Sequence, residues 1–168
     1  MNIFTKDKYL SDNELASLLL TLNNSTRDSL LLELAINTGA RASELLALTK
    51  ADINHIDKTV FIRGLKNSFD REMPLKDILY TRLSTYAYSV NTERLFPITY
   101  KRLFQIWQWY RPCSKKFHSL RHTFAIQLYK RTRDIKLVQV ALGHKSINTT
   151  MVYVDYTFRT EELRRLLL

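Results

Sequence analysis

The chain is short of glycine, proline and cysteine, and it has no long apolar run. Its 168 residues include 3 glycines and 3 prolines, which predicts a helix-rich fold with few irregular loops. The single Cys113 excludes a disulfide within the chain and is typical of a reducing cytoplasm. No apolar stretch approaches the roughly 20 residues of a membrane-spanning helix, and the polar opening residues lack a signal-peptide core. We therefore expect a cytoplasmic protein with no membrane partner.

Acidic side chains are also scarce relative to basic ones. The sequence has 26 Lys and Arg against 16 Asp and Glu, a net charge of +10. Such an excess indicates a polyanionic partner, most commonly nucleic acid, with a membrane surface as the weaker alternative. The sequence has no Cys/His spacing suited to zinc and no carboxylate cluster suited to a two-metal site. We expect neither a metal nor a cofactor.

The apolar periodicity predicts one domain, residues 1–168, that is mainly α with a small antiparallel β-sheet. A capping box at Ser11 and Glu14 opens the first helix, and Gly39 and Gly143 are expected to end later ones. The predicted helices cover residues 11–22, 26–39, 43–48, 76–88, 100–110, 118–130, 134–143 and 146–153. Two short strands, near 60–65 and 73–75, flank a turn at 64–71. The aromatic spacing of Phe104 and Trp107 favours core packing over base stacking.

Several charged and aromatic residues are not explained by packing. On the predicted helix from residue 118, His118, Arg121 and His122 share one face, opposite an apolar stripe. Arg41 follows Gly39 at a turn where a guanidinium can offer two parallel donors to a phosphate, and Glu44 lies three residues on. Taken singly, the residues on the helix are equally well explained as a solvated face, and Arg41 with Glu44 is better explained as a surface ion pair.

Two more such residues lie near the C-terminus. His144, just past Gly143, is expected to be exposed at a helix junction. Tyr153 by itself is one of nine tyrosines, and Tyr156 is a rival nucleophile by type.

Together, the segments that hold these residues resemble a known family. Thr-Gly-Ala-Arg-Ala-Ser-Glu-Leu-Leu-Ala-Leu (38–48), His-Ser-Leu-Arg-His-Thr-Phe-Ala (118–125) and Leu-Gly-His-Lys-Ser-Ile-Asn-Thr-Thr-Met-Val-Tyr (142–153) look like the three signature boxes of the tyrosine recombinases, the phage-integrase family. They occur in the family's order. The segment 63–75 is similar to the family's β-hairpin, whose lysine falls on Lys66.

The resemblance implies a tyrosine-recombinase catalytic-domain fold and a site-specific DNA recombinase. Such an enzyme cleaves and rejoins DNA without a metal, through a 3′-phosphotyrosine. The implied catalytic residues are Arg41 and Arg121 on the phosphate, Lys66 as general acid, His118 as base or phosphate donor, His144 as a further donor, and Tyr153 as nucleophile. Glu44 and His122 are expected to support these groups. A type IB topoisomerase and a non-catalytic DNA-binding regulator remain alternatives.

The expected partner is double-stranded DNA, with a homo-oligomer assembled on it. We expect sequence-independent phosphate contacts from Lys101, Arg102, Lys115, Lys116, Arg131 and Arg133. The amphipathic tail 160–168 is expected to pack either on a neighbouring protomer or on its own core. The resemblance implies an additional N-terminal DNA-clamping domain; we expect it to be absent here, in a short recombinase of phage, plasmid or prokaryotic origin or an excised domain.

Overall fold

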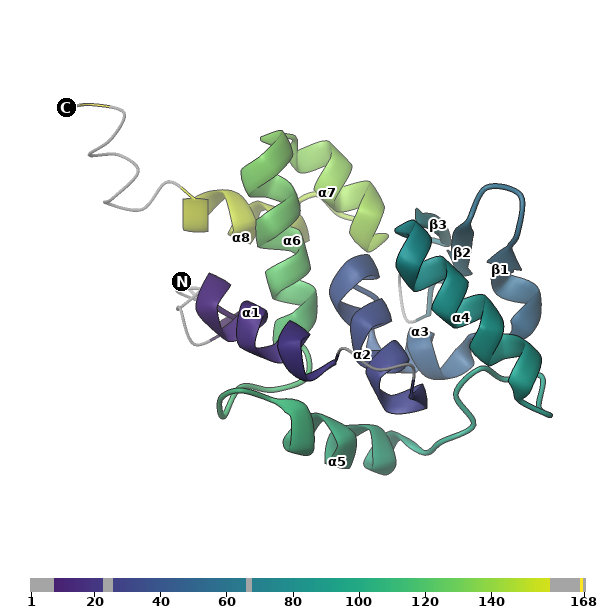
Figure 1. The fold of residues 1–168 in the computed structure, drawn as a ribbon. Helices are drawn as coiled ribbons and strands as arrows, with labels where there is room; N and C mark the ends of the chain where they lie inside the picture. The colour runs from purple at the N-terminus through teal and green to yellow at the C-terminus, as the bar shows by residue number, and fades with distance from the viewer. Residues whose placement is uncertain (1–7, 23–25, 66–67, 158–166, 168) are drawn as a thin grey trace.

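A computed structural model describes residues 8–22, 26–65, 68–157 and 167 of the chain. Within those residues the fold is mostly helical with one small sheet, as expected (Figure 1). The elements in chain order are α1 (Asp12–Thr21), α2 (Arg27–Thr38), α3 (Ala42–Ala47), the 3₁₀ turn η2 (Lys50–Asp52), β1 (Ile53–Asn54), β2 (Thr59–Ile62), β3 (Arg71–Pro74), α4 (Asp77–Ser89), α5 (Tyr100–Tyr110), α6 (Ser119–Thr132), α7 (Ile135–Leu142) and α8 (Asn148–Thr157).

The helix ends follow the capping signals in the sequence. The Ser11 hydroxyl accepts from the backbone N–H of Glu14, and the Glu14 carboxylate accepts from the backbone N–H of Ser11. Asp134 caps α7 in the same way, by accepting from the N–H of Leu137 at 3.0 Å. Gly143 ends α7 in the left-handed conformation, with φ of 69°.

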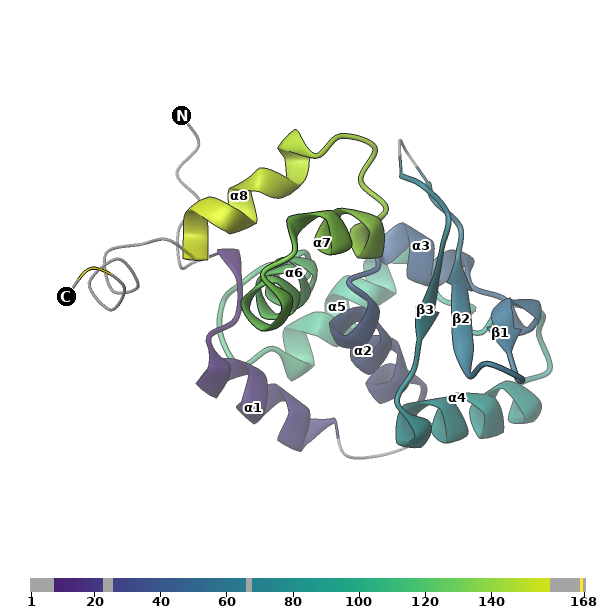
Figure 2. The same ribbon diagram turned by 90° about the horizontal axis from the view of Figure 1, so that it is seen from above.

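The sheet is antiparallel in the order β1-β2-β3. Val60 pairs with Met73 and Ile62 with Arg71, so these four positions share the inward face. Figure 2 shows α4 crossing one end of the strands, whereas the described ends of the connection from β2 to β3 lie at the other end, where the N–H of Phe69 donates to the carbonyl of Gly143 between α7 and α8. The hairpin therefore carries its loop toward the C-terminal helices.

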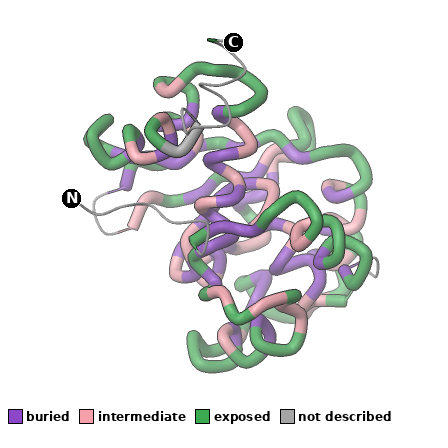
Figure 3. Tube along the Cα trace, turned by 90° about the vertical axis from the view of Figure 1, so that its left-hand side faces the viewer, coloured by how far each residue is buried: buried purple, intermediate pink, exposed green. Residues whose placement is uncertain are grey.

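The helices pack around α2 and α6. α2 contacts α3, α4 and α6, and α6 contacts α7 and α8 as well. Figure 3 shows the buried positions gathered along segments in the middle of the molecule. They form two apolar clusters, a larger one joining α1 to α5 with the sheet and a smaller one among α6, α7 and α8. Tyr153 belongs to the smaller cluster.

The structure differs from the sequence prediction in β1, in the start of β3 at Arg71, which the prediction placed in the turn, and in the end of the last helix. A third strand, β1, was not predicted, because two residues are too few for an alternating pattern to show. The last helix continues past Tyr153 to Thr157. The predicted tail 160–168 lies outside the described residues, apart from the exposed Leu167.

Two tryptophans on α5 test the packing. Trp107 is 2 % exposed and donates from Nε1 to the carbonyl of Lys115 at 2.8 Å, whereas Trp109 is 86 % exposed. Trp107→Ala should lower the free energy of unfolding by about 3–5 kcal/mol, since it empties a buried site. The control Trp109→Ala should change it by less than about 0.5 kcal/mol. Urea denaturation measures both, and equal losses would contradict the assignment of Trp107 to the core.

Candidate active site

A sharp turn places Arg41 at the start of α3. α2 ends at Gly39 with φ of 61°, a conformation that side chains other than glycine rarely adopt. A Cβ at this position would lie 2.5 Å from the ring of Phe124, so glycine is also required by packing. The chain then extends through Ala40 to Arg41, the N-cap of α3. The Arg41 side chain remains 27 % exposed, which leaves its guanidinium accessible to a ligand.

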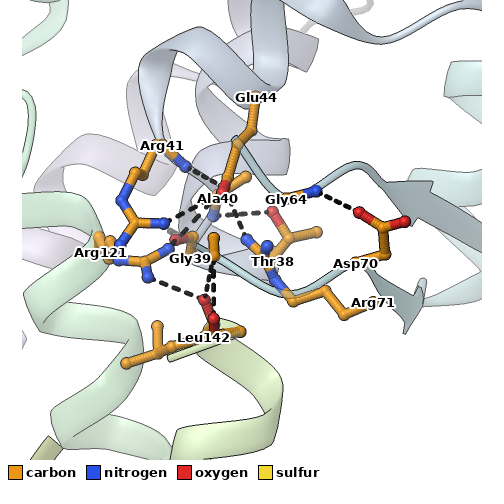
Figure 4. A network of polar contacts seen from close by, with 12 residues as sticks. Thr38, Gly39, Ala40, Arg41, Glu44, Gly64, Asp70, Arg71, Arg121 and Leu142 are labelled. Carbon is orange, nitrogen blue, oxygen red and sulfur yellow. Dashed lines mark hydrogen bonds and ion pairs between the residues drawn. The ribbon is translucent and has the colours of Figure 1, made fainter. Parts of the chain in front are cut away.

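The buried carboxylate of Glu44 collects donors from two directions (Figure 4). Its Oε2 accepts from the backbone N–H of Arg41 at 2.8 Å, and its Oε1 accepts from Arg41 Nη1 at 3.1 Å. Arg71 Nη2 donates to Oε2 at 2.8 Å. Burial raises the pKa of Glu44, but Arg71, the backbone of Arg41 and the charge of Arg121 outweigh it, and the pKa is lowered. Glu44 thus holds Arg41, as expected from the sequence.

Arg121 brings a third guanidinium to the same carboxylate. Its side chain is 2 % exposed, and Nη1 lies 3.9 Å from Oε2 of Glu44. Nη1 donates to the carbonyl of Gly39 at 2.7 Å and Nη2 to the carbonyl of Leu142 at 2.8 Å. Burial, together with the charge of Arg41, lowers the pKa of Arg121 to about 9, so the group stays charged at neutral pH. The structure therefore brings Arg41 and Arg121 together.

Tyr153 faces this group from α8. It is 2 % exposed, and its hydroxyl lies 3.0 Å from Nδ1 of His122. Burial raises the pKa of Tyr153 to about 12, although the charges of Arg121 and Arg41 act to lower it. Burial and the neighbouring His118 lower the pKa of His122 to about 3, so its ring is neutral at pH 7. In this arrangement the phenol is protonated and hydrogen-bonded.

The expectation that His144 is exposed is wrong. His144 is 7 % exposed, because the segment at Ser68 and Phe69 covers it and Thr150 lies 2.9 Å from its Nδ1. The backbone N–H of Phe69 donates to the carbonyl of Gly143 at 2.8 Å. Burial, followed by the charges of Arg121 and Arg41, lowers the pKa of His144 to about 4. A neutral His144 therefore sits against the same group of arginines.

His118 and Lys66 are less closely defined. His118 is exposed, and its ring meets the ring of His122 edge-on at 4.7 Å between centroids. His122, rather than His118, is thus the histidine in hydrogen-bond contact with the phenol of Tyr153. Lys66 lies outside the described residues, so its predicted place in the site stays a prediction.

Arg71 is the member of this group that we did not predict from the sequence. It opens β3 and alternates with Met73 toward the buried face of the sheet. The sequence prediction placed Arg71 in the turn at 64–71, so its alternation with Met73 on a buried strand face, which would have indicated an ion-pair partner, was missed. Its partner, Glu44, lies 27 positions away, a distance over which strand periodicity says nothing.

The sequence matches the model of a known protein family. The family model described as "Phage integrase family" matches residues 8–160. This chain belongs to the phage integrase family.

Two curated relatives from this family are tyrosine recombinases. XerA from Pyrococcus furiosus is 32 % identical over 91 % of this chain and 59 % of its own length. XerD from Staphylococcus epidermidis is 34 % identical over 80 % of this chain and 52 % of its own length. The chain therefore spans a little over half the length of these relatives.

Solved structures of the phage integrase family share the fold. The XerH site-specific recombinase bound to its difH substrate superposes with a TM-score of 0.72 at 28 % identity, over 95 % of this chain and 53 % of that one. The catalytic domain of bacteriophage HP1 integrase superposes with a TM-score of 0.69 at 26 % identity, over 92 % of this chain and 91 % of that one. The expected catalytic-domain fold is confirmed.

The basic residues predicted to contact DNA lie on α5, just before α6 and at the C-terminal end of α6. Lys101 and Arg102 are exposed on α5, and Lys116 is exposed in the segment before α6. Lys115 instead pairs with Glu14 at 2.6 Å, with 16 % of its side chain exposed. A lysine held in that way has less to offer a phosphate. At the other end of α6, Arg131 and Arg133 are exposed.

Within 8–22, 26–65 and 68–157 no helix has the length and apolar character needed to cross a bilayer. The same part of the chain contains no group of three His, Cys, Asp or Glu side chains placed to hold a metal ion. A reaction without metal or cofactor stays a prediction.

The contribution of the Glu44 charge to the free energy of unfolding should depend on pH. The pKa of Glu44 is lowered in the folded state, so its stabilisation is complete above the ordinary value of 4.5 and is lost as the pH falls through the folded value. Glu44→Gln should lower the free energy of unfolding by about 3–5 kcal/mol at pH 7, because Arg71 and Arg121 lose a buried counter-charge. Urea denaturation from pH 7 to 3 should show this gap shrinking below about pH 4.5.

Glu33 provides a control of opposite sign. Burial raises the pKa of Glu33 despite its ion pair with Arg82, so the folded state binds a proton that the unfolded chain does not. The wild type should therefore gain stability relative to Glu33→Gln as the pH falls toward 4.5. A gap at Glu44 that grows in acid would contradict the assignment.

Proposed function

We propose that this chain is the catalytic domain of a tyrosine site-specific recombinase, which breaks and rejoins double-stranded DNA through a 3′-phosphotyrosine. The observation that carries the proposal is the convergence of Arg41 and Arg121 on the carboxylate of Glu44, with their charges acting on the phenol of Tyr153. Guanidiniums are suited to the non-bridging oxygens of a phosphodiester. A phenol is suited to nucleophilic attack on its phosphorus.

In the proposed reaction, Tyr153 Oη attacks the scissile phosphorus while the bond from phosphorus to the 5′-oxygen breaks. Arg41 and Arg121 stabilise the negative charge of the pentacoordinate transition state. The products are a phosphotyrosine on the 3′ end and a free 5′-hydroxyl. Since the covalent link retains the energy of the phosphodiester, the reverse attack by a 5′-hydroxyl rejoins the strand without ATP.

Protons move at both ends of this exchange. The 5′-oxygen needs a proton to leave, and we assign its donation to Lys66, in the loop between β2 and β3. The phenol must lose its proton, and we assign His118 and His122 to that end of the reaction because they lie in a row before Tyr153. His144 is assigned a hydrogen bond to the phosphate.

The arrangement of Tyr153 corresponds to a resting state. Its pKa of about 12 and that of His122 of about 3 make proton transfer between them strongly unfavourable. At 2 % exposure the hydroxyl also has no access to a DNA backbone. We infer that α8 shifts when DNA binds, so that the phenol leaves His122 and meets a phosphate held by the arginines.

DNA as substrate is supported by the XerH structures, which are described as pre-cleavage and post-cleavage complexes with difH DNA. We extend this substrate class to the present chain, with assembly of several copies on DNA and packing of 160–168 on a neighbouring protomer. The net charge of +10 favours such a partner. We propose that residues 1–168 act as one catalytic domain in the cytoplasm.

A covalent adduct tests the proposal directly. The full chain is incubated with nicked duplex oligonucleotides of randomised sequence, in which loss of a short 5′ fragment prevents religation. We expect protein–DNA adducts that survive denaturation, enrichment of one DNA sequence among them, and a DNA-linked peptide that contains Tyr153. Tyr153→Phe should give no adduct, because its ring lacks the attacking oxygen.

Other outcomes would contradict parts of this proposal. The control Tyr156→Phe should retain the adduct, and a label on Tyr156 would overturn the choice of nucleophile. Adducts without sequence enrichment, together with relaxation of any supercoiled plasmid, would favour a type IB topoisomerase. DNA binding with no adduct on any duplex would favour a non-catalytic regulator.

The general acid has a separate test. Lys66→Ala should slow adduct formation roughly 10²–10⁴-fold, the usual contribution of a positioned proton donor. Replacing the bridging 5′-oxygen of the selected duplex by sulfur should restore the Lys66→Ala rate to within about 10-fold of wild type, because a thiolate leaves without a proton. Tyr153→Phe is the control, since no leaving group can rescue a missing nucleophile. A failure of sulfur to rescue Lys66→Ala would exclude the acid role.

A further inference from the structure

Arg71 is buried beside Glu44, the carboxylate that Arg41 and Arg121 also approach. Its side chain is 3 % exposed and gives one hydrogen bond, from Nη2 to Glu44 Oε2 at 2.8 Å. The same oxygen accepts the backbone N–H of Arg41 and lies 3.9 Å from Nη1 of Arg121. Arg71 is thus the strongest side-chain partner of the oxygen that lies between the other two arginines.

The position of Arg71 links three parts of the fold. It closes the loop that begins at Gly64, where the backbone N–H donates to the Asp70 carboxylate at 2.6 Å (Figure 4). Its Nη1 lies 3.2 Å from the place that a Cβ on Gly143 would occupy, so it also contacts the end of α7. Through Glu44 it reaches the start of α3. One guanidinium therefore connects the hairpin loop, α3 and α7.

Packing alone does not account for an arginine at this position. Nε and Nη1 of Arg71 are buried and have no hydrogen-bond partner among the residues that the structure describes. Unpaired buried donors destabilise a fold, and an apolar side chain of similar length would avoid that cost. The charge of the side chain is what an apolar residue would lack.

We propose that Arg71 is a positioning residue for the transesterification, which acts by fixing the carboxylate of Glu44 so that Arg41 and Arg121 address one phosphate. This proposal rests on the function proposed above. Without Arg71, Oε2 of Glu44 loses its side-chain donor and keeps only the backbone N–H of Arg41, so the carboxylate can move toward Arg121 across the 3.9 Å gap. That movement would draw Nη1 of Arg121 away from the carbonyl of Gly39, which it contacts at 2.7 Å. It would also weaken the hold of Glu44 on Arg41.

The charge pattern around the carboxylate agrees with this role. Three guanidiniums share one carboxylate, so a net positive charge remains for a phosphodiester. Arg71 contributes one of these positive charges from a buried position that a DNA backbone cannot contact. The charge of Arg71 also acts to lower the pKa of Arg121 and of His144, because it disfavours the charged form of each group. Both effects require the charge of the side chain rather than its volume.

Two variants separate charge from volume in the full chain. Arg71→Met keeps the approximate volume and removes the charge, whereas Arg71→Lys keeps a charge and one donor. With the nicked duplex selected above at saturating concentration, Arg71→Met should form adduct roughly 10–100-fold more slowly, as expected for misplaced phosphate contacts. Its DNA affinity should stay within about 3-fold of wild type, and Arg71→Lys should recover at least about a third of the lost factor on a logarithmic scale.

Matched controls exclude a general loss of stability. Arg82 pairs with Glu33 at 2.8 Å with 19 % of its side chain exposed, and it lies between α4 and α2, away from the Glu44 group. Arg82→Met should cleave within about 2-fold of wild type. In a Glu44→Gln background, Arg71→Met should slow cleavage by less than about 3-fold, because the group through which it acts is gone.

A readout without DNA completes the test. The Nε–H resonances of Arg41 and Arg121 in ¹⁵N NMR spectra should shift in Arg71→Met and not in Arg82→Met. The inference is overturned if Arg71→Met cleaves within about 3-fold of wild type, if Arg71→Lys and Arg71→Met are equally slow, or if the resonances do not move. Absence of adduct with the wild type would instead contradict the proposed function, while the NMR comparison would still decide whether Arg71 positions its neighbours.

Discussion

One buried carboxylate holds three arginines of this molecule together. Glu44 is reached by guanidiniums from the start of α3, from β3 and from α6, which are far apart in the sequence. Three like charges would repel one another without it, and a buried carboxylate would be protonated without them. The arginines and the carboxylate therefore each offset the cost of burying the other's charge. The left-handed turn at Gly39 brings the start of α3, with Arg41 and Glu44, close to Arg121.

The sequence predicts most of the helices because their signals are local. Capping at Ser11 and Asp134 and glycine stops at positions 39 and 143 act within a turn or two. The resemblance of three segments supplied the residues that meet at the site. The burial of His144 was missed because it depends on the hairpin loop packing against the end of α7 from more than 70 positions away. The partner of Arg71 was missed because Glu44 lies 27 positions away on another element. No periodicity within one element reports such a contact.

His122 shows a different limit of sequence reasoning. Helical spacing places it correctly on the face shared with His118 and Arg121. Spacing does not say which of two histidines one turn apart will meet the tyrosine, because that depends on how α8 lies across α6. In the structure the inner ring contacts the phenol and the outer ring contacts the inner one. The residue type was predictable and the order of contacts was not.

In the proposed reaction, the two apolar clusters support different groups of the site. Arg41 and Arg71 are held by α3 and the sheet, which belong to the larger cluster, and α6 carries Arg121 beside Leu120 of that cluster. Tyr153 packs in the smaller cluster among α6, α7 and α8. Release of one buried aromatic side chain costs about 1.5–3 kcal/mol of apolar burial, which is within the range that DNA contacts can supply. In the proposed reaction, a shift of α8 can therefore free Tyr153 while Glu44 and its arginines keep their places. Because the frame stays fixed, the charge that receives the phosphate is already in position when the phenol arrives, and little reorganisation remains for the transition state.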